Sequence, residues 1–193
     1  MRSFATTAAV LAATSLALVA CGDSQPSQSA VAATVNGTTV TMQSYNDAVQ
    51  ALRGRVEQRT GHVLNANTPG DAQRLAQLES TGIRGLVAAA VIEQLAAADH
   101  ISVSNGDVDT ALHTIGSSSG NPDQLVADLG AAGLTESTTH AAIRILLLQQ
   151  RLRATDPAGY DTTFANALRD AHVVVYAAPC TTDHAYPACL QGS

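Results

Sequence analysis

The most constraining feature of the sequence is a pair of short β-branched runs joined by Asn36-Gly37 near the start of a chain that is otherwise helical in pattern. Both central residues of a type I′ turn need a positive φ, and Asn-Gly meets this need best, so ATVNGTTVT predicts a β-hairpin. An isolated hairpin is marginally stable. The later run HVVVY, residues 172–176, is the strand that we expect to join it. The sequence therefore predicts one small sheet that connects both ends of a helical domain.

Helical periodicity fills the sequence between these strands. Thr41 is placed to cap a helix whose apolar residues repeat every 3.6 positions as far as Val56. Ser104 is placed to cap a later helix, with Asp107 three residues on as the second half of a capping box. The other helices are predicted over 72–100, 121–133, 135–155 and 161–170. These elements predict a mainly α-helical fold.

Residues 1–20 are typical of an export signal. Arg2 precedes an apolar run, Phe4 to Val19, which is too short and too rich in alanine for a membrane span. The run ends in Leu-Val-Ala-Cys21, which resembles the bacterial lipobox, and this implies that Cys21 becomes the first mature residue and carries a diacylglycerol. The alternative is an ordinary signal peptide with an incidental cysteine. We favour a lipid anchor on the extracytoplasmic side of a bacterial cell membrane.

Composition divides the rest of the chain into a tether, a domain and a tail. Residues 21–30 are small and polar, as in a flexible tether, so the folded domain is placed at 31–178 and a C-terminal tail at 179–193.

Charge and aromatic content limit the partners of the chain. The chain has 10 Lys+Arg, all of them Arg, against 16 Asp+Glu, and 3% aromatic residues. Such a chain lacks the basic patches and stacking platforms that nucleic acids require. We expect no nucleic-acid partner.

Two cysteines remain once Cys21 is assigned to the anchor. Cys180 and Cys189 would meet an oxidising compartment after export, so a disulfide that closes CTTDHAYPAC is the favoured interpretation. The alternative is a metal site formed by both cysteines and His184, with Asp183 nearby, but the spacing is not that of a structural zinc site. We expect neither a metal nor a cofactor.

The sequence offers no catalytic motif in the context that its chemistry requires. Residues 116–120, GSSSG, formally match G-x-S-x-G around Ser118, but a nucleophile elbow needs a preceding strand, and here a helix precedes. The six histidines show no paired ligand spacing such as H-E-x-x-H. Cys180 and Cys189 also lack the C-x-x-C spacing of redox proteins. We therefore expect a protein that is not an enzyme.

Three segments together resemble a known family. ATVNGTTVTMQSYNDAV, IRGLVAAAVIEQLAAADHISVSNGDVDTAL and LVADLGAAGLTESTTHAAIRILLLQQRL follow one another in the order and spacing of the N-terminal domain of SurA-like periplasmic chaperones, including PrsA-type lipoproteins. The resemblance covers roughly residues 31–153. It implies a helical domain with an apolar groove that holds unfolded or exported polypeptides.

The sequence departs from that family in one respect. Many members carry a parvulin-type isomerase domain after the LLLQQRL helix, whereas residues 154–160 lead directly to the next predicted helix, and no parvulin-like segment is present. Isomerase activity is therefore not carried over. The expected function is a chaperone-like binding protein, and the alternative is a structural or adaptor lipoprotein that docks to one fixed envelope partner.

The apolar run Ile145–Leu148 is the candidate binding surface. It is more apolar than one buried stripe requires, which has two explanations. The run is either a central helix packed on several sides or a helix that presents part of its apolar surface to client polypeptides. In the second case the candidate surface residues are Leu146, Leu147 and Leu86.

Overall fold

The computed structural model describes residues 30–118, 130, 134–177, 182–185 and 190. The elements are helices α1 (Met42–Thr60), α2 (Pro69–Ala98), α3 (Asn105–Ser118), α5 (Glu136–Thr155) and α6 (Tyr160–Asp170), and strands β1 (Val31–Val35), β2 (Thr38–Thr41), β3 (His172–Val175) and β4 (Thr182–Ala185). The fold is mainly helical with one small antiparallel sheet, as predicted. The helix predicted over 121–133 lies outside the described residues, apart from residue 130.

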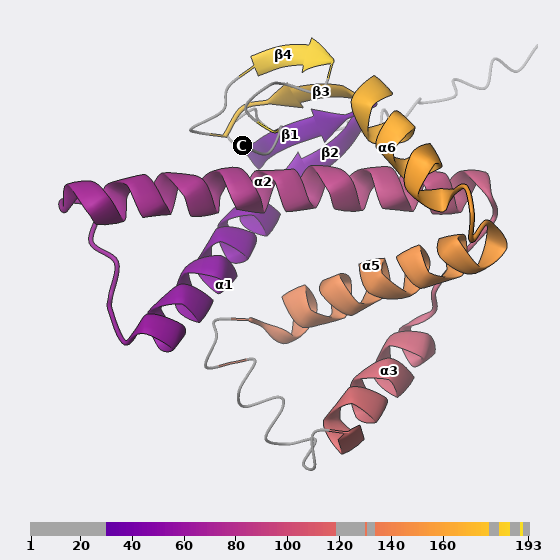
Figure 1. Ribbon diagram of the computed structural model, residues 1–193, viewed down its shortest axis with the longest axis horizontal. Helices are drawn as coiled ribbons and strands as arrows, with labels where there is room; N and C mark the ends of the chain where they lie inside the picture. The colour runs from indigo at the N-terminus through magenta and orange to yellow at the C-terminus, as the bar shows by residue number, and fades with distance from the viewer. Residues whose placement is uncertain (1–29, 119–129, 131–133, 178–181, 186–189, 191–193) are drawn as a thin grey trace, which may run out of the picture.

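The 30-residue helix α2 runs through the middle of the fold, with the sheet on one side and α1, α3 and α5 on the other (Figure 1). Gly82 and Gly85 do not interrupt it. A side chain at Gly82 would come within 3.1 Å of Val49 Cγ2 on α1, so glycine permits the close approach of the two helices. Within the described ranges, α2 is the one helix long and apolar enough to cross a membrane. Its buried residues are those of a helix inside a folded core.

The sheet confirms the predicted connection between the two ends of the domain. Its strand order is β2-β1-β3-β4, and every neighbouring pair is antiparallel. Asn36 and Gly37 have φ values of 50° and 83°, as the predicted turn requires. β3 pairs with β1 in a register that places Val35 opposite Val173. The fourth strand, β4, is not predicted by the sequence pattern.

Gln94 of α2 attaches the hairpin turn to the helix. Its Nε2 donates to the Val35 carbonyl at 2.9 Å and to Thr38 Oγ1 at 3.0 Å, and its Oε1 accepts from Asn36 Nδ2 at 2.8 Å. The His172 backbone N–H donates to Asn36 Oδ1 at 2.8 Å. One turn side chain and one helix side chain therefore connect β1, β2, β3 and α2.

The predicted helix caps are present. Thr41 Oγ1 accepts from the Ser44 N–H at 3.1 Å, and Thr135 Oγ1 accepts from the Thr138 N–H at 3.2 Å. Each cap satisfies one of the donors that the first turn of a helix leaves free. The beginnings of α1 and α5 are thus set by local side chains rather than by tertiary packing.

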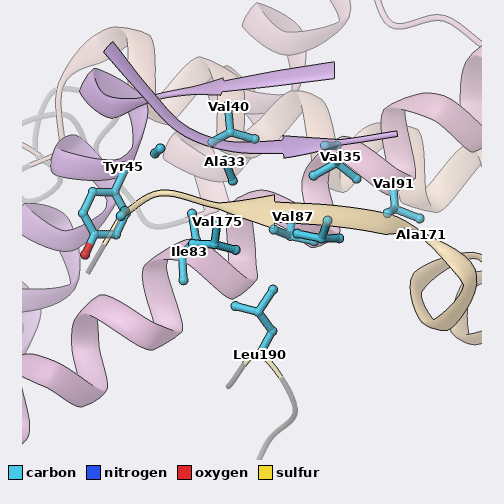
Figure 2. Packing of buried hydrophobic residues seen from close by; sticks show 14 residues of the cluster. Ala33, Val35, Val40, Tyr45, Ile83, Val87, Val91, Ala171, Val175 and Leu190 are labelled. Atoms are coloured by element: carbon cyan, nitrogen blue, oxygen red, sulfur yellow. The ribbon is translucent and has the colours of Figure 1, made fainter. Parts of the chain in front are cut away.

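Two apolar clusters form the interior. The main cluster lies between the sheet and α2 and includes Val35, Val173, Val175, Ile83, Val87 and Val91 (Figure 2). Leu190, 1% exposed, packs into the same cluster from the C-terminal region. β4 and Leu190 both lie beyond residue 178, where the helical domain was predicted to end.

Candidate functional site

The apolar run of α5 is distributed around the helix. Leu148 is buried, whereas Leu147, Ile145 and Ile143 are half-buried against the second cluster. Leu146 is 58% exposed. One helix thus supplies core residues and also presents a large apolar side chain to solvent. Core packing therefore accounts for Leu148 and its half-buried neighbours, and the binding of clients by Leu146 stays a prediction.

The second cluster is built from α2, α3, α5, α6 and the segment between α2 and α3. Its buried members are Ile92, Ala96, Val103, Val108, Leu148, Leu152 and Tyr160. The structure places Leu147 against this cluster and Leu86 against the main cluster. The three residues predicted to form one apolar surface are therefore divided between two clusters and the solvent, and their role in binding stays a prediction.

Two arginines of α5 bind the segment that leads into α3. Arg144 donates to the Val103 carbonyl and to Asn105 Oδ1, both at 2.6 Å. Arg151 donates to the Ser102 carbonyl and forms an ion pair with Asp107 Oδ1 at 3.0 Å. Sequence reasoning missed these contacts. The spacing of seven residues places Arg144 and Arg151 on one face of a helix, but it does not indicate which segment that face contacts.

The capping box of α3 belongs to the same arrangement. Asp107 Oδ2 accepts from the Ser104 N–H at 2.8 Å, and Ser104 Oγ accepts from the Asp107 N–H at 3.1 Å, as predicted. Hydrogen bonds from Ser104, with the charge of Arg151 as a smaller contribution, lower the pKa of the Asp107 carboxyl. Asp107 therefore carries the negative charge that Arg151 pairs with at neutral pH.

Val63 is a second exposed apolar residue, on a different part of the molecule. It is 70% exposed and lies in the connection between α1 and α2. Glu57 holds that connection, because its Oε1 accepts from the Leu64 N–H at 2.9 Å and from Arg53 Nε at 2.7 Å. These hydrogen bonds, of which the one from Arg53 contributes most, lower the pKa of the Glu57 carboxyl. Val63 is thus an exposed apolar residue in a connection that side-chain hydrogen bonds hold, and it belongs neither to α3 nor to α5.

Only some of the remaining predicted site residues lie in the part of the chain that the structure describes. Ser118 ends α3, and its hydroxyl donates to the Thr114 carbonyl at 2.8 Å, so a helix precedes it as predicted. Among the described residues, no group of three His, Cys, Asp or Glu side chains is arranged to hold a metal ion. Cys21, Cys180 and Cys189 lie outside the described residues, so the lipid attachment and the disulfide stay predictions.

Comparison with known proteins identifies the family. The model of the SurA-like N-terminal domain matches residues 1–153, which is most of the chain. The chain belongs to this family. The match ends within α5, at the position where the sequence resemblance ends. No curated protein and no solved structure matches the chain.

Membership in this family indicates a general function and location. SurA-like N-terminal domains are chaperone-like, bind unfolded polypeptides in general, and belong to the extracytoplasmic side of bacteria. The matched region contains α1, α2, α3 and most of α5, and so includes Leu146 and both arginines that bind the α3 segment. The sheet strands β3 and β4 and the helix α6 lie beyond it.

Proposed function

We propose that this SurA-like protein is anchored in the membrane through lipidated Cys21 and binds unfolded or exported polypeptides without isomerase activity. The observation that carries the proposal is Leu146, an exposed leucine on a helix that otherwise packs into the second cluster. Its side chain lies within the region that matches a chaperone-like family. The proposal assigns no catalytic residue.

An exposed leucine on a packed helix suits the capture of unfolded chains. Contact with a client's apolar side chain removes apolar surface of both partners from water, and this gain does not depend on a particular client sequence. The helix α5 is held by the second cluster and by its arginine contacts, so little order is lost when a client binds. Such a surface favours broad, weak binding.

Replacing Leu146 with glutamine tests this proposal. The change removes the exposed apolar side chain from α5 but leaves Leu148 and the rest of the cluster in place. We expect roughly tenfold weaker protection of denatured proteins, because the burial of one leucine contributes about 1.5–3 kcal/mol. The measurement is light scattering of several unrelated, chemically denatured proteins diluted into increasing amounts of the wild type or the variant.

Val63→Gln is the matched control, since it removes an apolar side chain that is even more exposed, 70% against 58%, from another surface. Its protection should equal that of the wild type. Equal protection by Leu146→Gln would show that α5 does not bind clients. A wild-type protein that protects no denatured protein but captures one envelope partner would support the adaptor alternative instead.

Cys21→Ala tests the anchor separately. Two or three acyl chains hold a soluble domain at the membrane, since each buried CH₂ contributes about 0.8 kcal/mol. The variant, expressed from the full-length sequence, should therefore move from the membrane fraction to the soluble extracytoplasmic fraction. Membrane retention equal to that of the wild type would contradict lipid anchoring and would leave the client-binding proposal unaffected.

A further inference from the structure

One face of the small sheet packs on α2, and the other face points away from it. Side chains alternate between the two faces of a strand, and in β3 the residues Val173 and Val175 are buried in the main cluster. Residues directly opposite each other in neighbouring strands share a face, and Thr34 is opposite both Thr39 and Val174. The residues on the side away from α2, which we call the outer face, are Thr34, Thr39, His172, Val174 and Tyr176.

Tyr176 gives the outer face an exposed aromatic ring close to the beginning of the domain. It directly follows β3 and is 39% exposed, whereas Val175 and Ala177 on either side of it are buried. Its backbone N–H donates to the Ala32 carbonyl at 2.8 Å, which fixes Tyr176 beside the second residue of β1. Tyrosine combines an apolar ring with a polar hydroxyl, and it is enriched where lipid meets water. The outer face thus has a side chain that suits a membrane interface next to the beginning of β1.

The segments that form the outer face lack formal charge. Residues 24–46 and 171–182 contain no Asp, Glu, Lys or Arg, in a chain with a net charge of -6. Each described helix, in contrast, contains acidic residues, and among the described strands only β4, at the edge of the sheet, contains one, Asp183. Anionic lipid headgroups repel an acidic surface. A surface formed by these two segments can approach a bacterial membrane without that repulsion.

The length of chain between Cys21 and β1 limits which side of the domain lies near the membrane. Cys21 and Val31 are ten positions apart, and this stretch spans at most about 35 Å when fully extended. Helix α2, with 30 residues, is by itself about 45 Å long. A lipid on Cys21 therefore keeps the beginning of β1 close to the bilayer, and Tyr176 lies at that end of the sheet.

We propose that the outer face of the sheet contacts the headgroup region of the membrane, with Tyr176 at the interface between headgroups and acyl chains. This inference rests on the lipid attachment at Cys21 in the proposed function and gives the anchored domain a fixed orientation. In that orientation α5 is on the side of α2 away from the sheet, and so away from the bilayer (Figure 1). The helix that carries Leu146 is then turned toward the space in which exported clients arrive.

The fluorescence of a single tryptophan tests the contact, because the sequence contains no tryptophan. Full-length, lipidated Tyr176→Trp is reconstituted into vesicles of phosphatidylethanolamine and phosphatidylglycerol whose acyl chains are brominated near the headgroup. Bromine quenches tryptophan only at close range, so a ring at the interface should lose roughly half of the emission that it has in unbrominated vesicles. Thr39→Trp places a second probe on the outer face and should be quenched as well.

Leu146→Trp is the matched control, since it places tryptophan at an exposed position of α5. Its emission should be the same in brominated and unbrominated vesicles. A Gly-Ser insertion that doubles the separation of Cys21 and Val31 along the chain supplies a second control. A contact made by the outer face should survive the insertion, whereas closeness that depends only on a short tether should not.

Flotation of the vesicles on a density gradient shows which proposal fails. If Tyr176→Trp does not float with the vesicles, the lipid anchor is wrong and the sheet contact fails with it. If it floats but neither outer-face probe is quenched more than Leu146→Trp, the sheet contact is wrong, and the anchor and client binding stand. If the quenching is lost when the tether is lengthened, the tether alone positions the domain and the sheet contact is again wrong.

Discussion

Replacing Leu190 with alanine is expected to lower the free energy of unfolding by about 2–5 kcal/mol, the range for truncating a buried leucine. Leu190 is 1% exposed and packs into the main cluster between the sheet and α2 (Figure 2). The alanine variant would leave a cavity beside close-packed residues of β3 and α2, which can collapse only in part. Urea denaturation followed by far-UV circular dichroism measures the change.

Leu146→Ala is the control for this prediction. It is the same substitution at a leucine that is 58% exposed, so the free energy of unfolding should change by no more than about 0.5 kcal/mol. If Leu190→Ala were as mild as Leu146→Ala, residues after 178 would contribute nothing to the core. The disulfide predicted between Cys180 and Cys189, if it forms, would be a second restraint on this region, since β4 lies between these cysteines in the sequence and Leu190 follows them.

Features encoded by adjacent residues could be predicted from the sequence. The Asn36-Gly37 turn requires only two residues with positive φ, and both have it. The caps at Thr41, Ser104 and Thr135 involve side chains and backbone groups within three residues of each other. The pairing of β3 with β1 was also predictable, because the β-branched run at its position needed a partner strand.

Features that depend on distant contacts were not predicted. β4, with the sequence TDHA, has no run of β-branched residues, and it is a strand because β3 offers a free edge for backbone pairing. Leu190 is a single leucine among polar and small residues, with no periodicity to mark it as buried. The hydrogen bonds from Arg144 and Arg151 to the α3 segment join residues that are separated by 41 and 49 positions in the sequence. No local pattern indicates contacts over such separations.

The candidate site shows the same division. The excess apolar character of α5 was visible in the run Ile145–Leu148, but the sequence could not decide which side chain faces solvent. The orientation of α5 follows from the tertiary contacts that bury Leu148 and leave Leu146 exposed. Leu86, which is predicted to belong to the same apolar surface as Leu146 and Leu147, packs against the main cluster.

Replacing Gln94 with alanine is expected to lower the free energy of unfolding by about 1–3 kcal/mol. The amide group of Gln94 donates to the Val35 carbonyl and to Thr38 Oγ1 and accepts from Asn36 Nδ2, so its removal leaves three polar groups of the hairpin without this partner. The turn would then lose these three hydrogen bonds to α2. Urea denaturation measures the loss, and hydrogen exchange should show faster opening of β2.

The control is Gln73→Ala, which truncates an exposed glutamine near the beginning of the same helix and should change the free energy of unfolding by no more than about 0.5 kcal/mol. Gln94→Glu makes the test sharper. It keeps an oxygen that accepts from Asn36, but it places a carboxylate against the Val35 carbonyl, so it should destabilise at least as much as the alanine variant. If Gln94→Glu were as stable as the wild type, the donor contacts would be unimportant, and the hairpin would be held by its turn and strand pairing instead.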